Sequence, residues 1–128
     1  MIDAQRQNKP YVTVVMPIRN EARFIERSLR AVLDQDYPSD RLEILVADGM
    51  STDGTRDLVA ALGSRSRNLR LISNPGAIVS VGLNRAIAEA RGEIVVRVDG
   101  HTVVEPDYVS RCVVALQTSG ADCVGGPM

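Results

Sequence analysis

The sequence lacks the features that mark several common classes of protein. Its 128 residues contain neither G-x-G-x-x-G nor G-K-[ST], so the usual dinucleotide-binding loop and the P-loop are excluded. No apolar stretch approaches the roughly 18 residues that a membrane span needs, and the polar N-terminus lacks the apolar run of a signal peptide. The chain is therefore not expected to cross a membrane by itself.

Cysteine and lysine are scarce. Cys112 and Cys123 lie in apolar surroundings and are interpreted as small buried side chains in a reducing compartment, with a disulfide or shared metal as the alternative. Lys9, the only lysine, lies in the N-terminal segment, whereas a receiver domain would need a basic residue at the end of its last strand. Because charges of both signs are mixed and the net charge is −1, nucleic acid is not expected as a partner.

What is present indicates one globular domain, with 45% hydrophobic and 24% charged residues. Residues 1–10 are expected to form a flexible tail and residues 11–128 the folded region. Short apolar runs predict strands at residues 11–16, 42–47, 69–72, 93–98 and 121–124. Helical periodicity lies between them, so an α/β fold is predicted: an open, mostly parallel sheet with helices on both faces. The first strand is expected to stop at Pro17, and Asn20 to cap the first helix.

Charged side chains follow three of the predicted strands. Arg19 and Glu21 come after the first, Asp48 after the second, and Asp99 and His101 after the fourth. The carboxyl ends of parallel strands share one edge of a sheet, so these side chains are expected to line one crevice. Such a crevice suits a metal ion and a phosphorylated ligand.

Each of these residues also has a purely structural interpretation. Asp99 and His101 offer ligands for Mn²⁺ or a similar cation, but Asp-Gly is also a common turn dipeptide. Asp48 is able to accept a hydrogen bond from a base, whereas Asp53 is interpreted as a helix cap. Glu21 is expected in the first turn of a helix. Arg97 interrupts an apolar run, and a buried arginine needs an acidic or phosphate partner, so Arg97 is expected either on an edge of the sheet or facing the crevice.

Five motifs occur in a fixed order along the chain. They are V-T-V-V-M-P-I-R-N-E at residues 12–21, Q-D-Y-P at 35–38, L-V-A-D-G-M-S-T-D-G-T at 45–55, G-L-N-R-A-I at 82–87 and G-E-I-V-V-R-V-D-G-H at 92–101. Over residues 11–124 this order resembles the family 2 glycosyltransferases. The resemblance is strongest to bacterial exopolysaccharide transferases of the succinoglycan type, whose metal motif is also D-x-H.

The resemblance implies a GT-A fold and an inverting transfer from a nucleotide-sugar donor, with a UDP-sugar favoured, to a polysaccharide or lipid-linked acceptor. It also implies a divalent cation, Mn²⁺ or Mg²⁺, held by Asp99 and His101. The nucleotide-binding residues that it implies are Pro17, Arg19, Glu21, Asp48, Asn84 and Asp99. Gly49 stands where the family has a second aspartate, and Leu83 where an arginine is frequent, so the base stays open.

The chain is interpreted as the donor-binding front part of a longer domain, truncated after about the fifth strand, with the general base beyond residue 128. We accordingly expect no sugar transfer by this part alone, and self-association through exposed strand edges. The expected location is the cytoplasm, or the cytoplasmic face of the inner membrane if a later region associates with it. The alternatives are a nucleotide-sugar binder without turnover and a receiver-like, flavodoxin-type domain.

Overall fold

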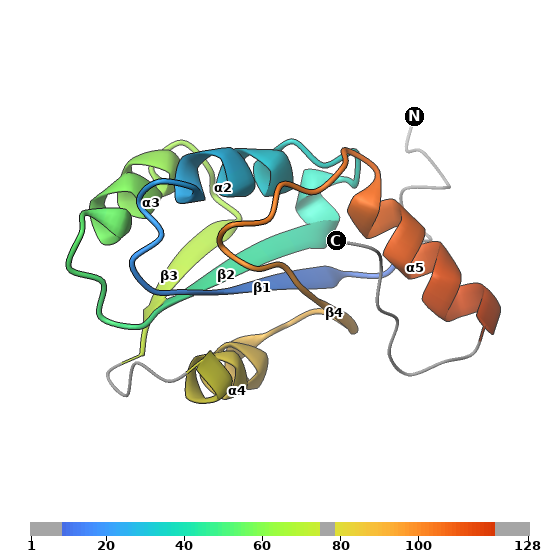
Figure 1. The fold of residues 1–128 in the computed structure, drawn as a ribbon. Coiled ribbons are helices and arrows are strands. Elements are labelled where there is room, and N and C mark those ends of the chain that lie inside the picture. The colour runs from blue at the N-terminus through green and yellow to red at the C-terminus, as the bar shows by residue number, and fades with distance from the viewer. Residues whose placement is uncertain (1–8, 75–78, 120–128) are drawn as a thin grey trace.

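The computed structural model describes residues 9–74 and 79–119 (Figure 1). In that part of the chain, four parallel strands form one sheet in the order β3-β2-β1-β4. The strands are β1 (Val12–Ile18), β2 (Leu42–Asp48), β3 (Leu69–Ser73) and β4 (Ile94–Arg97). The helices are α2 (Ile25–Leu33), the 3-10 helix η1 (Ser39–Arg41), α3 (Thr55–Gly63), α4 (Val79–Glu89) and α5 (Tyr108–Ser119). The predicted parallel sheet is confirmed, and the predicted strand at 121–124 lies outside the described residues.

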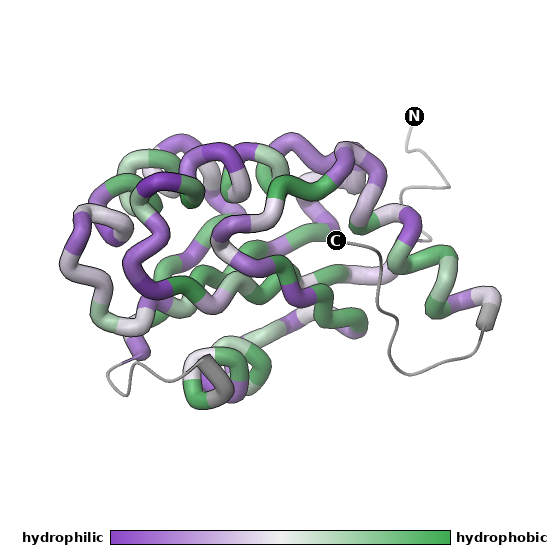
Figure 2. The backbone as a smooth tube through the Cα atoms, in the orientation of Figure 1, coloured by the Kyte–Doolittle hydropathy of each residue, from purple (hydrophilic) through white to green (hydrophobic). Residues whose placement is uncertain are grey.

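The two faces of the sheet carry separate hydrophobic clusters. Alternate residues of β1 and β2, such as Val14 and Ile44, pack with α2, α3 and α5 in the larger cluster. The residues between them, such as Val15 and Leu45, pack with Ala86 of α4 in the smaller one. Figure 1 shows α4 on the opposite side of the sheet from α2 and α3, and in Figure 2 the central strands are hydrophobic along most of their length. The helices therefore cover both faces, as predicted.

Strand β1 continues through Pro17, so the prediction that proline would end it is wrong. Backbone groups of alternate residues point to the same neighbouring strand, and the carbonyl of Val15 accepts a hydrogen bond from Val98 N at 3.0 Å. The nitrogen of Pro17 consequently faces the β4 side, where pairing ends at Arg97. A proline is tolerated at this position because no ladder hydrogen bond is required of it.

The Q-D-Y-P motif joins α5 to α2. Gln35 donates from Nε2 to the carbonyl of Glu105 at 2.6 Å, and its Oε1 accepts from Val109 N at 2.8 Å. Asp36 adds a backbone hydrogen bond to the carbonyl of Pro106 at 2.9 Å. These contacts hold the segment that follows β4, so the motif has a structural role and does not lie among the residues that follow the carboxyl ends of the strands.

A buried polar cluster lies at the amino edge of the sheet. Glu43 is 5% exposed, and its Oε2 accepts from Thr13 Oγ1 and from Arg91 N, each at 2.6 Å. Thr13 Oγ1 in turn accepts from Gly92 N at 2.9 Å. Arg70 approaches the other oxygen of Glu43 at 3.9 Å. A buried carboxylate with this many donors joins β1, β2 and the start of β4.

Two further expectations concern composition. Cys112 is a buried free thiol on α5, and burial raises its pKa, which agrees with its interpretation as a small apolar side chain. Cys123 lies outside the described residues. Across residues 9–74 and 79–119, none of the helices has the length and apolar character that crossing a bilayer would demand.

Candidate nucleotide and metal site

The carboxyl ends of β1, β2 and β4 lie together at one edge of the sheet. Ile18 pairs with Asp48 across β1 and β2, and Val15 pairs with Arg97 across β1 and β4. The connections that leave β1 and β2 lie side by side at the left of the view in Figure 1. The predicted convergence of the segments that follow these strands is thus present.

The connections after β1 and β2 are joined by Asn20. Its backbone N–H donates to Ser51 Oγ at 2.9 Å, and its Oδ1 accepts from Thr52 N at 2.8 Å. Its φ is 53°, a left-handed conformation that asparagine tolerates better than most residues. The prediction that Asn20 caps the first helix is wrong, because α2 begins at Ile25 and the Asn20 side chain is used across the two loops.

Asp53 makes a second link between the same loops. Its Oδ2 accepts from Ala22 N at 3.1 Å, and its Oδ1 accepts from Thr55 N at 3.1 Å and also from the Thr55 hydroxyl. These hydrogen bonds, that of the hydroxyl above all, lower the pKa of the Asp53 carboxyl. The N-cap residue of α3 is Gly54 and not Asp53 as predicted, so Asp53 contacts the start of the helix from the position before the N-cap.

Asp48 is fully buried at the end of β2. Its carboxylate accepts from Ser51 Oγ at 2.5 Å and from Ser51 N at 3.3 Å, and Arg56 Nη1 lies 3.6 Å from Oδ2. Arg56 was not identified from the sequence, because nothing in the motif marks it as a partner of Asp48. A base that binds Asp48 directly would have to share the carboxylate with these donors.

The segment from Arg97 to His101 meets the β1 connection. Asp99 Oδ1 accepts from Arg97 Nε at 3.0 Å, which supplies the acidic partner that the sequence required for this arginine. His101 Nδ1 lies 3.5 Å from Glu21 Oε1. The side chains of Asp99 and His101 are 29% and 59% exposed, so both are accessible to a ligand.

Gly100 permits this close approach. A Cβ at Gly100 would lie 2.7 Å from Ile18 Cγ2 and 3.1 Å from Glu21 Cγ, and Ser28 Oγ donates to the Gly100 carbonyl at 2.6 Å. Ile18 is β-branched and 4% exposed, so it has little room to move away. Ser28 escaped detection in the sequence because it looks like an ordinary residue of an amphipathic helix.

The other residues that the sequence predicted for this site are Glu21, Arg19, Pro17 and Asn84. Glu21 lies before α2 rather than in its first turn, and its carbonyl accepts from Ile25 N at 2.8 Å, so that prediction is wrong. Arg19 is exposed next to Glu21, and within the described chain the carboxylate of Glu21 contacts His101 instead. Pro17 is buried in β1, and Asn84 is exposed on α4.

Comparison with known proteins identifies the group to which this arrangement belongs. The family model described as Glycosyl transferase family 2 matches residues 13–128. The chain belongs to glycosyl transferase family 2. This membership excludes the receiver-like alternative.

Two curated relatives are similar to this chain over part of their length. The chain is 33% identical to Glycosyltransferase AglE of Haloferax volcanii, with 91% of this chain and 39% of that protein covered. It is 34% identical to the succinoglycan biosynthesis protein ExoA of Rhizobium meliloti, with 87% and 34% covered. The chain therefore spans between a third and two fifths of the length of these two relatives.

Solved structures support the GT-A fold that was expected for a family 2 member. The mannosyltransferase PcManGT from Pyrobaculum calidifontis, solved with GDP-Man and Mn²⁺, matches with a TM-score of 0.80 and 36% identity, covering 87% of this chain and 33% of that one. S. aureus TarS in complex with UDP matches with a TM-score of 0.74 at 22% identity, which supports the fold alone.

The donor chemistry of Asp99 and His101 fits a divalent cation such as the Mn²⁺ in the PcManGT structure. Carboxylate oxygen and imidazole nitrogen suit Mn²⁺, and both side chains are accessible. Within the described ranges no three histidine, cysteine or acidic side chains are grouped so as to hold a metal. Asp99 and His101 are therefore two candidate ligands, and the rest of a coordination shell would have to come from a bound ligand and water.

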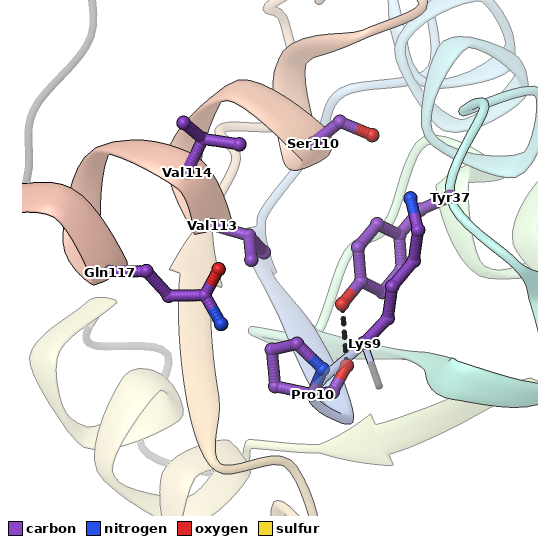
Figure 3. Close-up of a pocket in the computed structure, with 7 residues that line it drawn as sticks. All are labelled: Lys9, Pro10, Tyr37, Ser110, Val113, Val114 and Gln117. Atoms are coloured by element: carbon purple, nitrogen blue, oxygen red, sulfur yellow. Dashed lines mark hydrogen bonds between the residues drawn. The ribbon is translucent and has the colours of Figure 1, made fainter. Parts of the chain in front are cut away.

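A cavity elsewhere in the molecule is not part of this site. It has a volume of about 300 Å³, and Tyr37, Pro10, Val113 and Gln117 are among its lining residues (Figure 3). Tyr37 precedes β2 and Pro10 precedes β1, so the cavity lies at the amino edge of the sheet. The hydrogen bond from Tyr37 Oη to the Pro10 carbonyl, 2.5 Å long, holds this end together.

Proposed function

We propose that this chain is the donor-binding part of an inverting glycosyltransferase that moves a sugar from a nucleoside diphosphate to a polysaccharide or lipid-linked acceptor. The observation that carries the proposal is the contact of His101 with Glu21 at the edge where Asp48 ends β2 and where Asp99 lies just beyond the end of β4. The proposal is also supported by the similarity of this chain, at 36% identity, to a mannosyltransferase solved with GDP-Man and Mn²⁺.

In the proposed reaction the acceptor hydroxyl oxygen attacks the anomeric carbon while the bond from that carbon to the diphosphate oxygen breaks. Negative charge grows on the leaving diphosphate, and groups that neutralise it stabilise the transition state. Asp99 and His101 would hold a divalent cation, which supplies positive charge at the diphosphate. We assign the general base to no residue of this chain.

The nucleoside would lie against the two joined loops. Asp48, with its hydrogen bond from Ser51 and its ion pair with Arg56, would present a fixed wall to the base, while Arg19 and Glu21 lie on the neighbouring loop. Pro17 and Asn84 would contribute to the same pocket from β1 and α4. Because the links by Asn20 and Asp53 hold the loops before any ligand arrives, little ordering would be needed on binding.

Calorimetry tests the proposal. Titration with UDP, GDP and TDP, each with and without Mn²⁺, should show one preferred base and stronger binding with the metal. Free nucleotide at a hundred times its dissociation constant should also stabilise the fold by about 2.7 kcal/mol. Absence of both heat and thermal shift with all three nucleotides would contradict the proposal.

A binder without turnover is distinguished from a transferase by release of the nucleotide. A transferase releases nucleoside diphosphate faster when acceptor is added, whereas a binder does not. For a transferase whose donor is a nucleotide-sugar, we propose the cytoplasm, or the cytoplasmic side of a membrane, as the place of action.

A further inference from the structure

Arg97 and Asp99 form an ion pair inside the proposed site. The guanidinium Nε lies 3.0 Å from Asp99 Oδ1, and the two side chains are 51% and 29% exposed. Arg97 is the last residue of β4, so its backbone is held in the sheet through pairing with Val15. The carboxylate of Asp99, which we assign to the divalent metal ion, is thus already paired with the positive charge of Arg97.

The second proposed ligand is also engaged. His101 Nδ1 lies 3.5 Å from Glu21 Oε1. A divalent cation that arrives alone therefore meets two donors with existing partners, and it would lie next to a guanidinium that repels it. Unless negative charge arrives with the cation, its binding at Asp99 is opposed.

Resting on the proposed function, we propose that Arg97 exchanges partners when the donor binds. In this exchange the guanidinium leaves Asp99 as the cation takes the carboxylate, and it then pairs with the diphosphate. Guanidinium groups bind phosphate oxygens through directed, charge-assisted hydrogen bonds, so the new partner compensates for the old one. Arg97 would thereby make metal binding and nucleotide binding depend on each other.

The exchange has a thermodynamic signature. Mn²⁺ alone should bind weakly, and nucleotide should tighten Mn²⁺ binding by the same factor by which Mn²⁺ tightens nucleotide binding. Such coupling factors are typically between about 5 and 150. In the Arg97→Gln variant the competing charge is absent, so Mn²⁺ alone should bind up to about five-fold tighter. The coupling factor should fall by at least about five-fold, because the phosphate partner is also lost.

The experiment is a titration with Mn²⁺ followed by electron paramagnetic resonance, which measures free Mn²⁺. It is run on the wild-type chain and on variants, with and without saturating UDP or GDP, and the binding of Mn²⁺ to nucleotide alone is subtracted. Arg111→Gln is the matched control, because Arg111 also forms an exposed ion pair away from the proposed site. Arg111 Nε, on α5, lies 3.1 Å from Oδ1 of Asp107, the residue before the helix. Arg97→Lys keeps the positive charge but lacks the paired N–H donors of the guanidinium group, so it should retain part of the coupling.

The outcomes separate the two proposals. If wild type binds nucleotide with Mn²⁺ but Arg97→Gln behaves like Arg111→Gln, the exchange is wrong and the proposed function stands. Weaker binding of Mn²⁺ alone by Arg97→Gln would also overturn the exchange, since Arg97 would then only position Asp99. If wild type binds no nucleotide under any condition, both proposals fail.

Discussion

Glu43 at the amino edge of the sheet and Asp99 at its carboxyl edge differ in burial and in the number of their partners. At the amino edge Glu43 is buried, and two hydrogen bonds of 2.6 Å reach one of its oxygens. At the carboxyl edge Asp99 and His101 are partly exposed, and their contacts, to Arg97 and to Glu21, are with single side chains. The comparison indicates that Glu43 at the amino edge stabilises the fold, while Asp99 and His101 at the carboxyl edge, unlike the fully buried Asp48, are accessible to a ligand.

Removal of the buried carboxylate should have the largest effect on stability. Glu43→Ala leaves the Thr13 hydroxyl and the Arg91 N–H without their acceptor, so we expect a loss of about 3 kcal/mol in the free energy of unfolding. The control is Glu89→Ala, which removes an exposed carboxylate 3.7 Å from Arg70 and should cost less than about 1 kcal/mol. Urea unfolding measures both. Equal losses would show that the amino edge is not the stabilising one.

A methyl group at Gly100 should affect both stability and binding. The added Cβ would collide with Ile18 and Glu21, so Gly100→Ala should cost about 1–3 kcal/mol and displace the segment that carries Asp99 and His101. Nucleotide affinity in the presence of Mn²⁺ should fall roughly tenfold, the equivalent of about 1.4 kcal/mol.

Gly63→Ala is the control for this methyl group. Its Cβ would meet the end of the flexible Leu69 side chain at 2.8 Å, away from the carboxyl edge. It should lower stability less and leave nucleotide affinity unchanged. If calorimetry gives the two variants the same affinity, the packing of Gly100 does not position the site.

Loss of the imidazole should weaken binding without changing stability. His101 is largely exposed, so His101→Ala should alter the free energy of unfolding by less than about 0.5 kcal/mol. Mn²⁺-dependent nucleotide binding should weaken several-fold, while His101→Asp should retain part of it because a carboxylate also ligates Mn²⁺. Unchanged Mn²⁺ affinity in His101→Ala would show that the histidine is not a ligand.

Asp53 should give the smallest effect, which is measured as a change in the pH dependence of stability in acid. Its pKa is lowered from 3.8 by hydrogen bonds from Thr55 and Ala22. The folded state therefore binds this proton less readily than the unfolded state, so the contribution of Asp53 is present above pH 3.8 and is lost as pH falls through the lower folded pKa. Melting temperatures from pH 5 downward should decline less in Asp53→Asn than in wild type, and identical slopes would contradict the assignment.

The sequence predicted the sheet well because its strands are continuous apolar runs in a regular alternation with helices. It also predicted the edge at which Glu21, Asp48 and His101 would gather, since strand ends in a parallel sheet share an edge. It did not predict the role of Asn20, because a side chain that bonds across 32 residues leaves no local pattern. The partners Arg56 and Ser28 depend on tertiary packing in the same way.

Pro17 in β1 limits the length of the neighbouring strand β4. After the hydrogen bond from Val98 N to the Val15 carbonyl, the next rung would need an N–H from residue 17, and Pro17 has none. The pairing of β4 with β1 ends at Arg97, two residues before Asp99. A Pro17→Val substitution would supply this N–H, so a backbone atom of β1 limits how far β4 extends toward the proposed metal ligands Asp99 and His101.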